Sequence, residues 1–253
     1  MAGGELFLIG NRRKGTLSDG YATVGGQRFS ALFTSDPSPG DTLRLGGDVF
    51  VAERPNPCDL PAVMARKAQI IQPWDAAYMA LRAGVRSGSR VLESGVGSGA
   101  LSAVLLSIIG PSGRLVSADT DAQAISLARS NSSRFTDADN WELVNSDIHS
   151  VQRGDGFDAV FLDLPQPWDY LERASELCRP GGMVVCYSPT YNQVERTLEA
   201  SRDTHLMLVE SCTLRKENII VRPGSTRPDN NVIGHTGFIS FYIRLSGMEL
   251  QSF

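Results

Sequence analysis

The fold of this chain is decided by one stretch, Val91-Leu92-Glu93-Ser94-Gly95-Val96-Gly97-Ser98-Gly99. It places a Gly-x-Gly-x-Gly loop between an apolar strand and a helical pattern that begins at Ser98. Glycines let the backbone turn tightly and approach a ligand, and the start of the following helix presents free N–H groups. A dinucleotide site needs its third glycine one residue later, and a P-loop needs Gly-Lys-Ser/Thr, so neither motif fits. A purely structural turn remains an alternative.

The segments around this loop alternate between strand-like and helix-like patterns. Strand-like runs cover 89–92, 113–118, 156–162 and 183–187, and apolar residues at helical spacing cover 98–109, 121–135, 169–178 and 190–201. Such alternation is typical of a parallel sheet with crossover helices, so we predict an α/β fold. Near the end, 205–214 and 237–245 are strand-like with no helix between them, which predicts an antiparallel pair.

The first part of the chain has a different pattern. Its apolar runs are short and are separated by glycine-rich turns; they cover 6–9, 21–24, 29–33, 42–45 and 49–51. This pattern predicts a small β domain. Three prolines then fall within 53–61, where regular structure should lapse because proline fixes φ and removes a donor. We therefore predict a small β domain with its linker over 1–61 and a second domain over 62–253.

Composition excludes several classes of protein. The 253 residues carry a net charge of −4, so the chain as a whole is not a basic polyanion binder, although basic residues cluster at 12–14, 66–67 and 215–216. No apolar run approaches the roughly 20 residues that cross a bilayer, and no secretory signal is evident, so we expect a cytoplasmic protein. The four cysteines show no CxxC spacing, which favours reduced thiols and argues against a metal site.

Acidic side chains lie at the ends of three successive predicted strands. Glu93 ends the first, Asp119 follows the second, and Asp147 follows the strand over 142–144. The ends of parallel strands meet at one edge of the sheet, where ligands of open α/β folds bind. We expect Asp119 to accept hydrogen bonds from both hydroxyls of a ribose, and Asp147 to meet an adenine amino group. Capping of the helix that begins near 121 is the alternative for Asp119.

With these residues the chain resembles class I S-adenosylmethionine-dependent methyltransferases, whose loop reads E/D-x-G-x-G-x-G. Four further segments resemble the tRNA adenine-N1 methyltransferase family that modifies the T-loop adenosine at tRNA position 58: QIIQPWD at 69–75, LDLPQPW at 162–168, YSPTYNQ at 187–193 and IGHTGF at 233–238. The resemblance spans roughly residues 60 to 245. It implies a Rossmann-like class I fold, with a mostly parallel seven-stranded sheet and an antiparallel last strand, preceded by a small β domain.

The resemblance also implies a cofactor, a substrate and a set of site residues. The cofactor would be S-adenosyl-L-methionine, the substrate tRNA and the assembly a homotetramer, with no metal. Cofactor-binding residues would be Gln72, Glu93, Gly95, Val96, Gly97, Ser98, Gly99, Ala100, Leu101, Asp119, Asp147 and Asp163. Asp163 and Tyr191 would be catalytic, and Tyr78, Trp168, Tyr191 and His235 would bind the substrate.

Methyl transfer to adenine N1 mainly requires alignment of donor and base. A carboxylate near the exocyclic amine can accept its hydrogen bond and stabilise the cationic product, and Asp163 is our candidate. The alternative for Asp163 is capping a helix that starts at Asp169, and packing is the alternative for Trp168.

Two segments depart from the family pattern. Gln72 stands where relatives often have tyrosine, and 215–217 lacks the tryptophan that follows the arginine in relatives. Two other functions compete: a class I methyltransferase with another acceptor, such as protein isoaspartate, and a non-catalytic tRNA-binding subunit. The chain keeps Gly95, Gly97 and Gly99 of the loop together with Asp119 and Asp163, so we predict a catalytically active enzyme.

Overall fold

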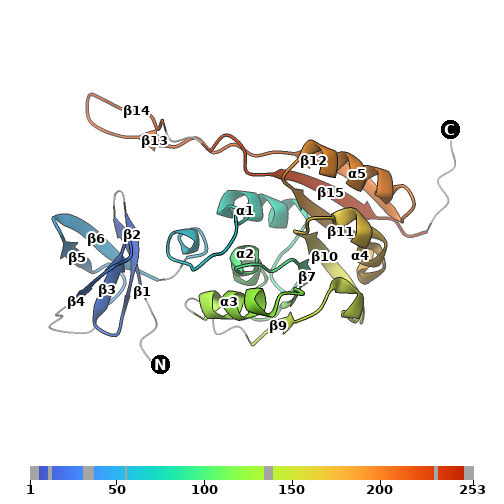
Figure 1. Cartoon of the computed structure of the whole chain (residues 1–253), viewed down its shortest axis with the longest axis horizontal. Coiled ribbons are helices and arrows are strands. Elements are labelled where there is room, and N and C mark those ends of the chain that lie inside the picture. Colours follow the sequence, from blue (N-terminus) through green and yellow to red (C-terminus); the bar gives the residue numbers. More distant parts are fainter. Residues whose placement is uncertain are drawn as a thin grey trace.

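The computed structural model describes residues 6–10, 13–30, 37–54, 56–133, 139–230 and 233–247. Figure 1 shows a small sheet from the first part of the chain beside a larger sheet with helices on both faces. Three predictions fall partly outside the described residues: Arg12 of the first basic cluster, the end of the run over 29–33, and the end of the helix over 121–135.

The small sheet has six antiparallel strands in the order β4-β3-β2-β1-β6-β5. The strands are β1 (Leu6–Gly10), β2 (Lys14–Ser18), β3 (Tyr21–Val24), β4 (Gln27–Ser30), β5 (Thr42–Leu45) and β6 (Asp48–Glu53). Leu8, Ala22 and Phe50 are buried in its own core, as a β domain requires. Sequence analysis missed β2, because Leu17 is its only large apolar residue and its pairing with β1 and β3 determines its structure.

The large sheet has seven strands in the order β12-β15-β11-β10-β7-β8-β9. They are β7 (Arg90–Ser94), β8 (Arg114–Ala118), β9 (Trp141–Val144), β10 (Phe157–Leu162), β11 (Cys178–Ser188), β12 (Leu206–Cys212) and β15 (Phe238–Arg244). Strand β15 runs opposite to the other six strands of this sheet, and it pairs with both β11 and β12. The predicted fold class and the predicted antiparallel pair are therefore confirmed.

The central strands are apolar throughout because both faces of the sheet are covered. Side chains alternate between the faces, so Val91 and Phe161 pack on the side of α1 (Pro73–Arg82) and α2 (Ala100–Ile109). Leu92 and Leu162 pack on the side of α4 (Leu171–Leu177). The remaining helices are α3 (Ala122–Ser132), α5 (Tyr191–Ser201) and the short η1 (Leu60–Ala62), η2 (Ile148–Ser150) and η3 (Pro167–Tyr170).

Three elements differ from the sequence prediction. The helix predicted over 169–178 is split into η3 and α4, and Cys178 already belongs to β11, because Arg179 precedes a proline and is disfavoured in helical conformation. Helix α1 was not predicted. The hairpin of β13 (Ile219–Ile220) and β14 (Arg227–Pro228), also unpredicted, lies on a long extension between β12 and β15 (Figure 1).

A small apolar cluster joins the two sheets. Phe7 of β1, Leu60 of η1 and Ala103 of α2 are buried together. An ion pair between Lys14 of β2 and Asp59, just before η1, adds a polar contact at the same joint. The boundary predicted near residue 62 remains a proposal, since these contacts tie the linker to both sheets.

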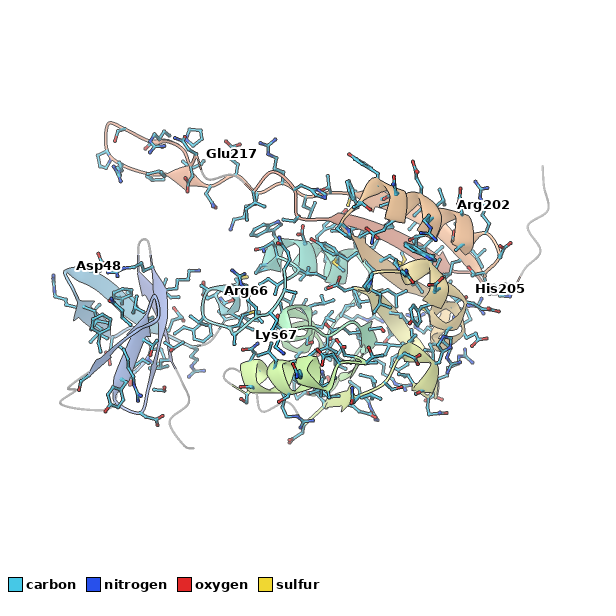
Figure 2. The ribbon with its side chains drawn as sticks, in the orientation of Figure 1. Asp48, Arg66, Lys67, Arg202, His205 and Glu217 are labelled. Carbon is cyan, nitrogen blue, oxygen red and sulfur yellow. The ribbon has the colours of Figure 1, made fainter. Side chains whose placement is uncertain are left out.

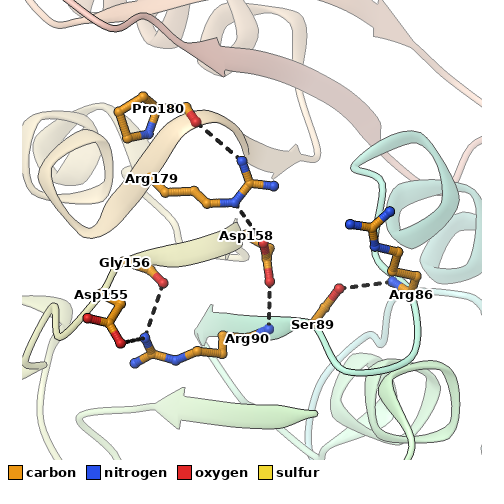
Figure 3. A network of polar contacts seen from close by, with 8 residues as sticks. All are labelled: Arg86, Ser89, Arg90, Asp155, Gly156, Asp158, Arg179 and Pro180. Atoms are coloured by element: carbon orange, nitrogen blue, oxygen red, sulfur yellow. Dashed lines mark hydrogen bonds and ion pairs between the residues drawn. The ribbon is translucent and has the colours of Figure 1, made fainter. Parts of the chain in front are cut away.

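At the N-terminal edge of the large sheet, charged groups are paired (Figure 3). Asp158 of β10 accepts hydrogen bonds from Arg179 Nε at 2.7 Å and from the backbone N of Arg90 at 2.8 Å. The Arg90 guanidinium lies 3.8 Å from Asp155. Burial alone would raise the pKa of Asp158, but the hydrogen bonds and charge of Arg179 outweigh it and lower that pKa.

Two features bear on possible partners. Among the described residues, no helix has both the length and the apolar character that crossing a bilayer requires. The same residues contain no group of three or more His, Cys, Asp or Glu side chains that could hold a metal ion, and the four cysteines are free.

Candidate functional site

The glycine loop joins β7 to α2 at the C-terminal edge of the large sheet. Gly95 has φ +90°, and a Cβ there would lie 2.1 Å from the backbone oxygen of Asp163. Gly99 has φ +82°, and a Cβ there would lie 3.1 Å from Cβ of Ala128 in α3. Side chains at these two positions would be both strained and obstructed. At Gly97, by contrast, a Cβ would meet nothing within 4 Å, so this part of the loop faces open space.

Glu93 is a buried carboxylate directly under the loop. Its Oε2 accepts hydrogen bonds from Ser102 and Ser117, each at 2.6 Å. Its Oε1 is buried and has no partner among the described residues. Burial raises the pKa of Glu93 to about 7, against the lowering effect of the two serines. An unpaired buried acceptor is costly, so this oxygen indicates a place for a donor from a ligand or a water.

A cavity of about 240 Å³ lies at the ends of four parallel strands. Its walls come from the residues that end or follow β7, β8, β9 and β10: Ser94, Gly95, Ala118, Asp119, Thr120, Ser146, Asp147, Leu164, Pro165, Gln166 and Tyr170. A smaller cavity of about 30 Å³ lies on the other side of the loop and is lined by Gln69, Ile70, Ile71, Glu93, Gly95, Val96, Gly97, Ser98, Ala100, Leu101 and Asp163. Except for Gln72 and Gly99, every predicted cofactor-binding residue lines one of these two cavities.

Asp119 and Asp147 already hold backbone groups at the larger cavity. Asp119 accepts from Gly97 N at 3.1 Å and from Asp121 N at 2.9 Å, so it fixes the glycine loop. Asp147 accepts from His149 N at 3.0 Å and caps η2. Asp121, and not Asp119, caps α3. Each carboxylate oxygen can accept a further hydrogen bond, so both aspartates can also bind a ligand.

Asp163 follows β10 and faces the glycine loop. Its backbone N donates to Ser94 O at 2.9 Å, which fixes the start of the loop 163–168. In the described part of the chain, its carboxylate has no hydrogen bond or ion pair, and neither η3 nor α4 has a side-chain cap. The side chain keeps accessible surface at the cleft while protein encloses it elsewhere; desolvation, with the charge of Asp119, raises the pKa of Asp163 to about 7.

Three aromatic rings lie together beside the loop that carries Asp163. Tyr191 at the start of α5 is 71% exposed, and its ring centroid is 4.3 Å from that of Phe238. The ring centroid of His235 lies 4.5 Å from that of Phe238, and Nε2 of His235 is 3.2 Å from Pro189 O. Gln193 Nε2 donates to Pro165 O at 2.9 Å, which ties α5 to the loop 163–168. The exposed Tyr191 ring is thus available to a ligand.

The remaining predicted residues lie in other environments. Trp168 is in η3, with the Arg196 guanidinium 4.1 Å from its ring centroid, so one face of the indole is occupied. Tyr78 packs edge-on against Phe241 and donates to Glu210 at 2.5 Å, and it lines none of the cavities described. Gln72 lines a separate cavity considered below.

Sequence analysis missed part of this site. Thr120 and Ser146 follow β8 and β9 and could have been found by the rule that led to Asp119 and Asp147. Tyr170 and Phe238 had no comparable indication, because their places depend on η3 and on the pairing of β15 with β11.

A family model and individual relatives of known activity both match this chain, and all of them are described as tRNA methyltransferases. The family model for the tRNA methyltransferase complex GCD14 subunit matches residues 53–225. The tRNA (adenine(57)-N(1)/adenine(58)-N(1))-methyltransferase of Methanocaldococcus jannaschii is 29% identical over 220 residues, covering 77% of this chain and 78% of the relative. The tRNA (adenine(58)-N(1))-methyltransferase of Thermus thermophilus is 27% identical over 237 residues, covering 93% and 91%.

A solved structure shows the same fold. The SAM-dependent O-methyltransferase of Thermotoga maritima matches with a TM-score of 0.81 and 24% identity, covering 97% of this chain and 94% of that one. At this identity the likeness concerns the fold and not the acceptor.

Proposed function

The chain belongs to the tRNA methyltransferase complex GCD14 subunit family, and from this membership we propose that it transfers a methyl group from S-adenosylmethionine to N1 of adenosine 58 in the T-loop of tRNA. The observation that carries the proposal is the unpaired Asp163 carboxylate beside the glycine loop. The proposed assembly is a homotetramer, and the proposed compartment is the cytoplasm.

The residues at the sheet edge fit this cofactor. The larger cavity offers Asp119 and Asp147 as acceptors for ribose hydroxyls and an adenine amine. The unpartnered Glu93 Oε1 and the open space at Gly97 lie on the other side of the glycine loop, where they would hold the amino-acid portion of the cofactor. When bound, the cofactor supplies an electrophilic methyl carbon on a sulfonium. Carboxylates without cationic partners favour such a positive charge nearby.

Asp163 acts on the acceptor base. Its carboxylate accepts a hydrogen bond from the exocyclic amine of adenine, which holds N1 toward the donor. Methylation at N1 leaves a positive charge on the base, and the carboxylate stabilises this charge as it develops. The ionised form is required, so the raised pKa of Asp163 makes this role dependent on pH near neutrality.

Tyr191 supplies a surface for the extruded base. A T-loop adenine must leave its stack to reach the cleft, and aromatic faces commonly receive such bases. The exposed Tyr191 ring, backed by Phe238 and His235, is a surface of this kind, and Gln193 on the same helix bonds to Pro165 in the loop 163–168. Trp168 is the weaker candidate because Arg196 already covers one face of its ring.

Methyl transfer to defined RNA tests the proposal. Unmodified tRNA is incubated with methyl-labelled donor, beside a transcript in which adenosine 58 is replaced by guanosine. We expect label in the first RNA as 1-methyladenosine and a loss of most label in the second. Equal labelling of both, or no transfer by folded protein that binds the donor, would reject the proposal and favour another acceptor or a non-catalytic tRNA-binding subunit.

A further inference from the structure

A third cavity, of about 540 Å³, lies beside the proposed donor site. Its walls come from η1, from the segment that leads to α1 and from the loop before β15, and include Pro61, Ala62, Arg66, Gln69, Gln72 and Ile233. Its volume is within the range of small-molecule sites. None of the roles proposed above uses it.

Arg66 is an unpaired cation in the wall of this cavity. Its side chain is exposed, and none of the hydrogen bonds, ion pairs or ring contacts found in the described ranges involves its guanidinium. The neighbouring Lys67 differs, because its amine donates to Gln123 of α3. Figure 2 shows Arg66 and Lys67 between the small sheet and the helices of the large sheet. A free guanidinium fork is well suited to two oxygens of one phosphate.

Amide side chains accompany Arg66 in the wall of this cavity. Gln69 and Gln72 line the cavity, and the Gln72 amide donates only a long hydrogen bond, 3.5 Å to Ile70 O, within the described part of the chain. Arg, Lys and Gln side chains are the groups that bind the sugar–phosphate backbone of nucleic acids.

The cavity adjoins the site of the reaction. Gln69 and Ile70 line both this cavity and the smaller cavity that contains Glu93 and Asp163. A nucleotide whose base reaches Asp163 leaves its sugar–phosphate backbone outside the cleft, and the shared residues Gln69 and Ile70 place this wall beside that opening. The overall charge of −4 makes such local cations important for an RNA ligand.

We propose that this cavity binds the sugar–phosphate of a nucleotide next to the target adenosine, with Arg66 contacting the phosphate. The inference rests on the proposed function, because it takes RNA as the ligand. It gives a role to Gln72: a side chain directed at the RNA backbone, where sequence analysis had expected a contact with the cofactor.

Equilibrium binding of RNA tests the proposal without requiring methyl transfer. The full-length protein, Arg66→Ala and Arg66→Lys are titrated with unmodified tRNA over a range of salt concentrations. We expect Arg66→Ala to weaken binding about tenfold and to reduce the salt slope by about 1, as for loss of one charged phosphate contact. Arg66→Lys should recover the slope but only part of the affinity, since lysine lacks the bidentate fork.

Arg202→Ala is the matched control. Arg202 is also exposed but lies beyond α5, at the other end of the large sheet (Figure 2). Its replacement should change neither the affinity nor the slope. Donor affinity and melting temperature should be unchanged in all variants, which excludes misfolding as the cause.

Replacing a single phosphate of the RNA by an uncharged methylphosphonate identifies the phosphate that Arg66 contacts. T-arm hairpins with a methylphosphonate on either side of the target adenosine are bound to wild type and Arg66→Ala, and the loss caused by Arg66→Ala should shrink at one of these linkages. An undiminished loss at both, or wild-type affinity in Arg66→Ala, would overturn the subsite while leaving methyl transfer to adenosine 58 intact. Arg66-dependent RNA binding without methyl transfer would instead reject the proposed function.

Discussion

The carboxylates at the two edges of the large sheet differ in their pairing and in the direction of their pKa shifts, although the same strands form both edges. At the N-terminal edge, Asp158 is held by Arg179 and by the backbone of Arg90, and its pKa is lowered (Figure 3). At the C-terminal edge, Glu93 and Asp163 have no cationic partner among the described residues; burial raises the pKa of Glu93 to about 7, and desolvation by the surrounding protein, with the charge of Asp119, raises that of Asp163 to about 7.

This difference separates stabilising charges from functional ones. A carboxylate paired with a cation contributes to folding, and its charge is already balanced within the protein. An unpaired one is unfavourable in the folded protein alone and becomes favourable when a cation arrives, as perturbed groups at functional sites do. A sulfonium donor and a methylated, cationic adenine both meet this requirement. The C-terminal edge therefore gives up stability that the N-terminal edge retains.

The largest expected effect is on catalysis at the unpaired edge. Asp163→Asn removes the charge that stabilises the cationic base but keeps the shape of the side chain. We expect kcat for tRNA to fall about 100- to 1,000-fold, with donor affinity changed far less, when initial rates and donor binding are measured.

Asp169→Asn is the matched control for that variant. Asp169 lies in η3, six residues after Asp163, and its exposed side chain lines none of the cavities described. Its replacement should leave kcat within about twofold of wild type, by the usual small effect of surface substitutions. A similar loss in both variants would mean that the loop 163–168, and not the carboxylate, matters.

A smaller effect is expected on stability at the paired edge. Asp158→Asn loses a charge-assisted bond to Arg179 but keeps an acceptor, so we expect about 1 kcal/mol of destabilisation at neutral pH by denaturant unfolding. The pKa of Asp158 is lowered in the folded state, so its contribution is present above the unfolded pKa and is lost as pH falls through the folded value. The difference between variant and wild type should therefore vanish in acid.

Asp155→Asn provides the comparison for that measurement. Asp155 is fully exposed and lies 3.8 Å from Arg90, so solvent screens this pair and its replacement should leave stability unchanged within the error of the measurement. Any loss of kcat in Asp158→Asn at a temperature where it is folded would contradict the separation of the two edges.

The fold could be predicted from the sequence because the apolar runs, the helical spacing and the glycine loop all indicated the same parallel α/β sheet. Apolar runs such as 156–162 are buried on both faces, and the glycine loop fixes which strand comes first in the site. Elements with mixed composition were missed: β2 depends on its neighbours for pairing, and α1 begins at a proline within a motif that suggested no helix. Tertiary context decides such segments.

The site residues that directly follow strands of the parallel sheet could be predicted from the sequence. Asp119, Asp147 and Asp163 each come directly after a strand, so their meeting at one edge follows from parallel topology. Tyr78 and Trp168 could not be placed this way, because the partners that engage them, Glu210 and Arg196, are distant in sequence. Asp158 lies at the start of its strand, and nothing in the sequence around it predicts its pairing with Arg179.

The central claim is that an uncompensated carboxylate at the C-terminal edge carries the reaction, and the pH dependence of kcat/KM for the donor tests it most directly. This parameter reports ionisations of the donor-free protein. Because the pKa of Asp163 is raised to about 7 and the ionised form is the active one, wild-type kcat/KM should rise with pH and level off above about 7. Glu93→Gln should retain a rising profile, whereas Asp163→Asn should be low and flat. A flat wild-type profile, or a rising one that persists in Asp163→Asn, would contradict the account.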